Sequence, residues 1–245
     1  MLDNINEILL TLTVALAVAA VAVRLLLRAN RIEWIKRFLT WLLEYVDVGL
    51  SALVIALVVR SFVVEPFKIP SSSMEDTLLI GDQLFVNRFI YGMRVPFIKS
   101  RPLALRKPVR GDIIVFVPPH RRDTDFIKRV VGTPGDTIEI KNQVVYVNGR
   151  VIEEAYVRHK EPGSLSRLNY RRDNLDKITV PPDKYFMMGD NRDRSEDSRY
   201  WGYASLADIK GKAMIVYFSW KHDSAAPAWN LADKIRWGRL FRLIR

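Results

Sequence analysis

The stretch DFIKRVVGTPGDTIEIKNQVVYVNG, residues 125–149, decides the expected fold. It contains three short runs of apolar and β-prone residues, separated by pairs typical of tight turns. The last pair, Asn148-Gly149, is a common hairpin turn. Short strands joined by such close turns pair with their neighbours, so the stretch predicts antiparallel β-sheet. The three runs are Phe126–Val131, Thr137–Ile140 and Val144–Val147.

The same pattern continues through residues 65–245, where prolines and Gly-Asp pairs punctuate short apolar runs. Helical patterns are limited to short stretches near Ala204–Lys210, and the polar segment 153–177 is typical of an exposed ribbon or mobile loop. We therefore predict a mainly β domain over 65–245, with a small exposed insertion at about 150–180. Its remaining expected strands are Gln83–Phe89, Asp112–Val117, Lys184–Met188 and Lys212–Phe218.

The first 64 residues follow a different pattern, that of a membrane anchor. Ile8–Val23 carries no charge, and residues 5–27 together are long enough to cross a bilayer. A cleaved signal peptide is the alternative, but such peptides begin with positive charge, whereas this chain begins with Asp3 and Glu7. We expect an uncleaved first transmembrane helix.

A second transmembrane helix is expected at about 43–64. Its uncharged part, Val48–Val59, is short, and Arg60 can extend its charge to the membrane surface. The alternative is an amphipathic helix lying on the cytoplasmic face. If the helix crosses, everything after Val64 lies outside the cytoplasm.

A basic stretch connects the two expected spans, and positive residues of this kind remain on the cytoplasmic side. We therefore expect a basic cytoplasmic loop, with the chain's first residues facing outward. The positive residues are Arg24, Arg28, Arg31, Lys36 and Arg37, against one acid, Glu33.

The 245-residue chain has a formal net charge of +11, which fits nucleic-acid binding, contact with anionic lipid, or simple solubility. The apolar runs favour lipid, and no zinc-finger or RNA-binding signature supports a nucleic-acid partner. The basic and apolar residues of 229–245 either touch lipid headgroups or pack on the domain. Cysteine is absent and the three histidines, His120, His159 and His222, are scattered, so we expect no metal and no cofactor.

Three clusters carry residues capable of chemistry: PSSSMEDTL at 70–78, DFIKRVVGTPGD at 125–136 and MMGDNRDRSEDSR at 187–199. Singly, each has an ordinary explanation. A serine triplet commonly forms a turn or a helix cap, and a lysine in a strand is commonly on the surface. The third cluster resembles a solvated loop and lacks the glycine and glutamate that a calcium-binding EF-hand requires.

Together the three clusters resemble the type I signal peptidases, also called bacterial leader peptidases, in order, spacing and sequence. The resemblance spans roughly residues 48–220 and includes RSFVVEPFKIP at 60–70, LIGD at 79–82 and RGDIIVF at 110–116. Two places depart from the family pattern. Glu75-Asp76 stands where a hydrophobic or acidic residue and a proline are frequent, and Arg194 stands where asparagine is common.

The resemblance implies a serine endopeptidase with a Ser–Lys dyad, in which Ser73 is the nucleophile and Lys128 its general base. The Ser73 backbone N–H and the Ser71 hydroxyl would form the oxyanion hole, and Ser195 would orient Lys128. A lysine acts as a base only when neutral, which requires its pKa to fall by roughly 2–3 units from about 10.4. Burial among the apolar neighbours of Lys128 would lower the pKa in this way.

The resemblance also implies supporting residues, substrates and a location. Ion pairs of Asp190 with Arg129 and of Asp197 with Arg199 would brace the site. Substrates would be exported preproteins, cut after a small-x-small motif and bound extended along a strand edge. Membrane lipids are further expected partners, with the protein-export machinery as a candidate, at the bacterial cytoplasmic (inner) membrane with the catalytic domain on its extracytoplasmic face. The implied pocket residues are Phe67, Ile69, Leu78, Val115, Phe126 and Ile127.

Three other functions were weighed against this one. A specialised peptidase with the same dyad, maturing one exported protein, fits the same residues. A self-cleaving repressor shares the chemistry but has a DNA-binding module in place of membrane spans. An inactive peptide-binding scaffold would lack Ser73 or Lys128, and this sequence has both.

Overall fold

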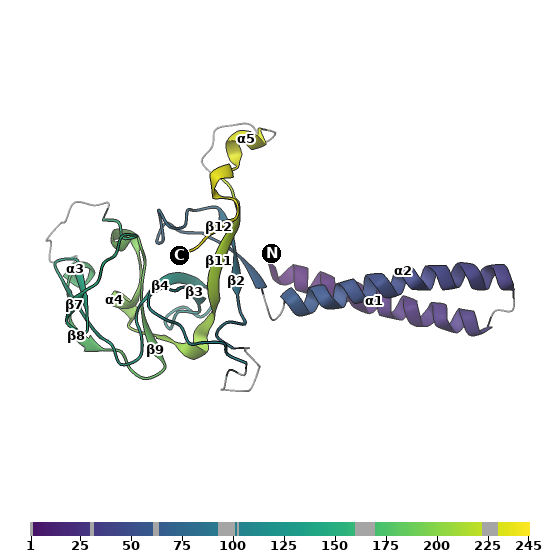
Figure 1. The fold of residues 1–245 in the computed structure, drawn as a ribbon, viewed down its shortest axis with the longest axis horizontal. Coiled ribbons are helices and arrows are strands. Elements are labelled where there is room, and N and C mark those ends of the chain that lie inside the picture. Colours follow the sequence, from purple (N-terminus) through teal and green to yellow (C-terminus); the bar gives the residue numbers. More distant parts are fainter. Residues whose placement is uncertain are drawn as a thin grey trace. The chain divides into compact units, whose positions relative to one another are not determined.

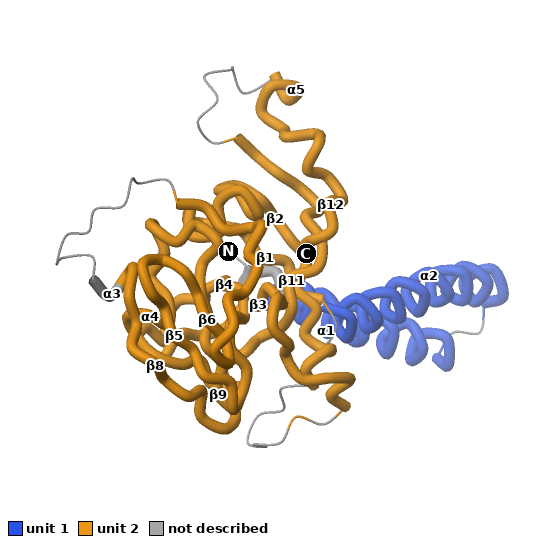
Figure 2. Tube along the Cα trace, turned by 60° about the vertical axis from the view of Figure 1, so that its left-hand side comes forward, with its two compact units in different colours: residues 1–63 blue, residues 64–245 orange. Residues whose placement is uncertain are grey.

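The computed structural model describes residues 2–29, 32–60, 64–92, 101, 103–159, 170–221 and 230–245. The chain divides into two compact units, Met1–Val63 and Val64–Arg245 (Figure 2). The first unit is a pair of helices and the second is built mainly from β-strands (Figure 1).

The helical unit consists of α1 (Leu2–Ala29) and α2 (Glu33–Val58), which pack side by side. Both are long and apolar enough to cross a membrane. Between them, Arg24 Nη2 donates to both carboxylate oxygens of Asp47, at 2.8 and 2.9 Å. The two helices are therefore joined by a bidentate ion pair as well as by apolar packing.

The helix boundaries differ from those expected. The second helix begins at Glu33 rather than near 43, because its charged first turn consists of good helix formers and continues into the apolar run. Arg24 and Arg28 lie in α1, and Lys36 and Arg37 lie in α2, so the expected basic loop is largely helical. Arg31 and residues 61–63 lie outside the described residues.

The larger sheet of the second unit has the strand order β1-β2-β11-β3-β4-β9-β10, and β12 pairs with β11. The pairings along it are antiparallel. Its strands are β1 (Val64–Lys68), β2 (Asp82–Asn87), β3 (Ile113–Phe116), β4 (Phe126–Gly132), β9 (Lys184–Met188), β10 (Ala204–Ser205), β11 (Ile209–Ser219) and β12 (Arg242–Leu243).

A smaller antiparallel sheet has the order β7-β6-β5-β8. Its strands are β5 (Thr137–Lys141), β6 (Val144–Val147), β7 (Arg150–Val151) and β8 (Leu175–Thr179). The predicted hairpin turn follows β6, where Asn148 and Gly149 both have positive φ, at 54° and 76°. The predicted class, antiparallel β-sheet preceded by two apolar helices, is confirmed.

Short helical elements connect the strands. They are α3 (Tyr170–Asp173), η3 (Arg192–Arg194), α4 (Ser198–Trp201), η4 (Leu206–Asp208), α5 (Leu231–Lys234) and η5 (Trp237–Arg239). The segment 204–210, expected to be partly helical, has only the single turn η4 between two strands.

Five of the described strands were not expected from the sequence: β1, β8 and the two-residue strands β7, β10 and β12. β1 contains Pro66, which suits its position at the edge of the sheet, where one side of the strand needs no donor. β8 lies within the segment expected to be exposed. It was not recognised as a strand because it has few apolar residues, of which Leu175 and Ile178 pack against the core. The middle of that segment, 160–169, lies outside the described residues.

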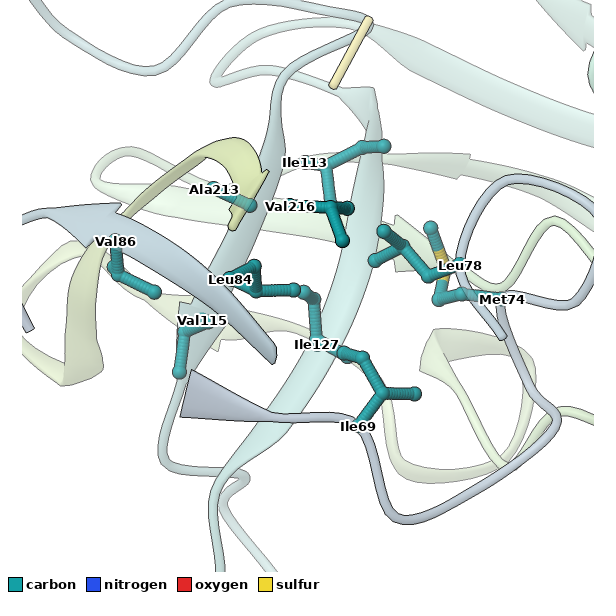
Figure 3. Packing of buried hydrophobic residues seen from close by; sticks show 10 residues of the cluster. All are labelled: Ile69, Met74, Leu78, Leu84, Val86, Ile113, Val115, Ile127, Ala213 and Val216. Carbon is teal, nitrogen blue, oxygen red and sulfur yellow. The ribbon is translucent and has the colours of Figure 1, made fainter. Parts of the chain in front are cut away.

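The core consists of three buried apolar clusters, and the strands contribute alternate residues to different clusters. In β4, Ile127 belongs to the first cluster, Val130 to the second and Val131 to the third. Lys128 therefore shares the β4 face of Val130, not that of Ile127. The first cluster, shown in Figure 3, contains Ile69, Met74, Leu78, Leu84, Val86, Ile113, Val115, Ile127, Ala213 and Val216.

Candidate active site

Ser73 and Lys128 meet inside the β unit. Ser73 lies on the loop between β1 and β2, and Lys128 lies in β4, which is paired on both sides. Lys128 Nζ donates to Ser73 Oγ at 2.6 Å, and the two residues are 4% and 5% exposed. Fifty-five positions apart in sequence, they form a directly hydrogen-bonded pair shielded from bulk water.

The surroundings of Lys128 favour its neutral form. Burial lowers its pKa to about 8, while the carboxylates of Asp197 and Glu196 act in the opposite direction. The amine lies 5.3 Å from the centre of the Phe126 ring, and Ile114 is its cross-strand partner. A substantial fraction of this lysine is therefore able to accept a proton near pH 8.

A cavity of about 320 Å³ opens beside the pair. Of the predicted pocket residues, Phe126 and Ile127 line it, whereas Ile69, Leu78 and Val115 are buried in the first core cluster and Phe67 packs against that cluster. Its full lining is Pro70, Ser71, Ser73, Arg121, Thr124, Asp125, Phe126, Ile127, Lys128, Arg194 and Glu196.

Ser71 contributes a second hydroxyl at this cavity. Its Oγ lies 3.4 Å from Ser73 Oγ and its side chain lines the same space. A hydroxyl in this position is able to donate a hydrogen bond to a substrate oxygen held next to Ser73.

Two buried ion pairs flank the dyad. Arg129 donates to Asp190 through Nε and Nη2, at 2.9 and 2.7 Å. Arg199 similarly donates to Asp197 at 2.8 and 2.9 Å. Burial acts to raise the pKa of Asp197, but the Arg199 guanidinium and the Gly189 N–H hold it below its usual value. The Asp197 carboxylate therefore remains charged, and both carboxylates are held in position by their arginines.

Ser195 is close to the dyad but does not hydrogen-bond to Lys128 in this structure. Its Oγ is buried, and the side chain it interacts with is the Asp197 carboxylate, whose pKa it helps to lower. Ser195 also packs against Gly189, where an added Cβ would lie 2.3 Å from Ser195 Oγ and 2.5 Å from the Ser73 carbonyl oxygen. Only glycine permits this close approach of the two loops.

Two residues that support the loop carrying Ser73 were not singled out from the sequence. Asn191 donates its backbone N–H to the Ser73 carbonyl and its Nδ2 to the Ser72 carbonyl, both at 3.1 Å. Thr77 Oγ1 donates to Asp190 Oδ2 at 2.6 Å. Both residues lie within the quoted clusters, but bonds between distant loops leave no local pattern in a sequence.

Of the two departures from the family pattern, Asp76 forms an ion pair and Arg194 borders the cavity. Asp76 has a φ of 77° and accepts a hydrogen bond from Arg158 Nε at 2.8 Å, so its added charge is balanced. Arg194 lines the cavity. No group of three or more His, Asp or Glu side chains able to hold a metal ion occurs in the described ranges.

Comparison with known proteins identifies the family. The model of the family described as "Signal peptidase, peptidase S26" matches residues 42–220, more than half of the chain. The chain belongs to this family. It is therefore a serine peptidase of the signal peptidase class, and its two apolar helices fit a membrane anchor.

Similar proteins carry the same description. The signal peptidase I of Pseudomonas aeruginosa is 40% identical over 209 residues, covering 73% of this chain and 73% of the relative. That of Rickettsia massiliae is 35% identical over 231 residues, covering 78% and 86%. The crystal structure of a signal peptidase I from Enterococcus faecalis aligns with a TM-score of 0.37 and 35% identity, covering 44% of this chain and 97% of the solved one.

Proposed function

We propose that this signal peptidase is a membrane-bound endopeptidase that removes signal peptides from exported preproteins by a Ser73–Lys128 dyad. The observation that carries the proposal is the 2.6 Å hydrogen bond between Lys128 Nζ and Ser73 Oγ in a buried setting. A serine hydroxyl is a weak nucleophile until a neighbouring base takes its proton.

The reaction would begin with neutral Lys128 accepting the Ser73 proton as Oγ attacks the scissile carbonyl carbon. Lys128 then gives that proton to the leaving amine, which yields an acyl-enzyme on Ser73. It next takes a proton from water, and the resulting attack releases the signal peptide's carboxylate and frees Ser73. A lysine whose pKa is about 8 suits both proton-accepting steps near neutral pH.

The tetrahedral intermediates place negative charge on the former carbonyl oxygen. The Ser73 backbone N–H and the Ser71 hydroxyl are the proposed donors to it, because the two side chains border one cavity. Asn191 and the Arg129–Asp190 pair fix the backbone on which these donors lie. Ser195, which makes no hydrogen bond to Lys128 here, would orient the amine once substrate is bound.

The substrate would be an extended peptide with small side chains near the cleaved bond. Phe126 and Ile127 give the cavity an apolar wall, and β1 offers a sheet edge that an extended peptide can pair with. Anchoring in the bilayer raises the effective concentration of membrane-held signal peptides. Membrane lipids are therefore proposed partners, and the protein-export machinery is a further candidate.

The proposed location is the bacterial cytoplasmic membrane, with the β unit on its extracytoplasmic face. Arg28, Lys36 and Arg37 flank the connection between α1 and α2, and positive residues next to membrane spans stay in the cytoplasm. After two crossings, the chain from Val64 onward then lies on the outer side.

Cleavage of a preprotein by the full chain in detergent tests the proposal. We expect Ser73→Ala and Lys128→Ala each to lower kcat/KM by at least about 10³-fold, since they remove the nucleophile and its base. Lys177→Ala, on the exposed face of β8, is the matched control and should retain wild-type activity. Full activity in either dyad variant would refute the assignment.

A further inference from the structure

His120 lies next to the active-site cavity and contacts two of the residues that line it. It lies in the connection between β3 and β4, and its Nε2 is 3.0 Å from Glu196 Oε1. Its ring stacks on Trp201, with centroids 5.9 Å apart and planes at 24°. The same ring meets Phe126 edge-on, at 5.7 Å and 76°.

Two of these three contacts also border Lys128. Phe126 lines the cavity, and its ring centre lies 5.3 Å from Lys128 Nζ. Glu196 lines the same cavity from the 192–197 segment. Trp201 ends α4, the helix capped by Asp197. His120 thus links the β3–β4 connection to the segment that carries Ser195, Glu196 and Asp197.

We infer that His120 is a positioning residue for Lys128, holding the Glu196 carboxylate and the Phe126 ring at the edge of the cavity in which the amine acts. The inference rests on the proposed dyad. An imidazole with its hydrogen on Nε2 donates to the carboxylate while its ring packs between Trp201 and Phe126, so one side chain makes both contacts.

The charges near Lys128 show why this contact matters. Asp197 and Asp190 are each held by a buried arginine, whereas Glu196 is half-exposed and is held by His120. The negative charge of Glu196 acts to raise the pKa of Lys128, together with those of Asp197 and Asp190 and against that of Arg199. A substitution at His120 therefore changes how strongly the Glu196 charge acts on the pKa of Lys128.

Several other charged groups lie near His120 and Glu196, among them Arg121 and Arg194, which line the cavity with Glu196. On the connection that carries His120, Arg122 pairs with Asp208, and Asp125 pairs with Lys210. The remaining charged residues of this connection are Arg121 and Asp123. The variant Glu196→Gln distinguishes an effect of Glu196 on the pH dependence of cleavage from an effect of these other groups.

The test is a double-mutant cycle of His120→Phe and Glu196→Gln in the full chain, with kcat and KM for a signal-sequence peptide measured from about pH 6 to about pH 10. Phenylalanine keeps an aromatic ring between Trp201 and Phe126 but removes the donor. His120→Gln is the converse variant, which keeps a donor but removes the ring. Wild type and Ser73→Ala report separately on the proposed function.

We expect His120→Phe to lower kcat about two- to fivefold with little change in KM, a size typical of the loss of one polar side-chain contact. The acid limb of kcat/KM should move to higher pH, because Glu196 loses its donor and its charge acts more strongly on Lys128. Glu196→Gln should move that limb to lower pH, and adding His120→Phe to it should produce no further shift. His120→Gln should keep the limb near that of wild type.

An unshifted acid limb in His120→Phe, or the same shift with and without Glu196→Gln, would overturn the inference. If His120→Phe does not fold, a wild-type limb in Glu196→Gln, or a displaced one in His120→Gln, overturns it equally. In all these cases Ser73-dependent cleavage by wild type leaves the proposed function standing. Cleavage that survives Ser73→Ala refutes the proposed function and this inference with it.

Discussion

Lys128 shows how a residue's chemistry depends on its place in a sheet. As part of a charged pair in sequence, Lys128-Arg129 resembles many surface positions. In the structure β4 is buried on both of its faces, so the side chains of Lys128 and Arg129 are both buried although they point in opposite directions. Arg129 is paired with Asp190, whereas burial lowers the pKa of Lys128 and makes it available as a base.

The lowered pKa of Lys128 predicts the pH dependence of cleavage. Below about pH 8 the amine is protonated and cannot accept the Ser73 proton, and above it the neutral form predominates. We expect kcat/KM to rise with pH through about 8, approaching a tenfold loss per unit on the acid side. If kcat/KM instead rises only near the ordinary pKa of lysine, about 10.4, then burial does not lower the pKa of Lys128.

Gly189 should not tolerate a larger side chain. Its missing Cβ leaves room for Ser195 and for the Ser73 carbonyl, so Gly189→Ala forces the loop carrying Ser73 to move. We expect a loss of activity of at least tenfold and a fall of about 1–3 kcal/mol in the free energy of unfolding. Gly238→Ala, where a Cβ meets nothing within 4 Å, is the control. Wild-type activity in Gly189→Ala would contradict the packing described here.

The limits of sequence reasoning are clear at this scale. The residues of the Ser73–Lys128 contact and of both ion pairs could be named in advance, because they lie in specific motifs. The face of β4 on which Lys128 lies could not, since alternate residues of a strand point to opposite sides. The contacts of Asn191 and Gly189 also depend on how two distant loops meet, which no local pattern reports.

At the scale of elements, the Arg24–Asp47 pair is the specific link between α1 and α2. Charges within apolar helices are costly unless paired, so Asp47→Ala should loosen the helix pair, and the exchange Arg24→Asp with Asp47→Arg should restore it. The chain has no cysteine, so Leu16→Cys with Gly49→Cys, at neighbouring positions, gives a clean disulfide assay.

We expect Asp47→Ala to slow this cross-linking about threefold, since polar contacts between membrane helices contribute about 0.6 kcal/mol. The exchanged pair should cross-link at the wild-type rate. Equal rates in all three proteins would show that apolar packing alone holds the helices together.

Strands with strong signals were predictable, and those with mixed signals were not. β4, β6 and β9 combine β-prone residues with clear turns, and their expected bounds agree with the structure within one residue. β1 contains a proline that only an edge position tolerates, and β8 has few apolar residues because one of its faces is exposed. Recognising either strand requires knowledge of its neighbours.

At the scale of the whole molecule, the larger sheet and the buried loops of the β unit converge on one site. The loop after β1 supplies Ser73, β4 supplies Lys128, and the segment after β9 supplies Asp190 and Asn191. Two apolar helices precede these elements in the chain. This order matches an enzyme whose substrates are held in a membrane and cut just outside it.

In the proposed reaction Ser73 becomes acylated, with Lys128 as its base. The most direct measurement is mass spectrometry of the full chain, acid-quenched during turnover of a signal-sequence peptide ester. We predict an added acyl mass on the proteolytic fragment that contains Ser73, absent in Ser73→Ala and strongly reduced in Lys128→Ala. An acyl group on another residue, or unchanged labelling in Ser73→Ala, would contradict the proposed reaction.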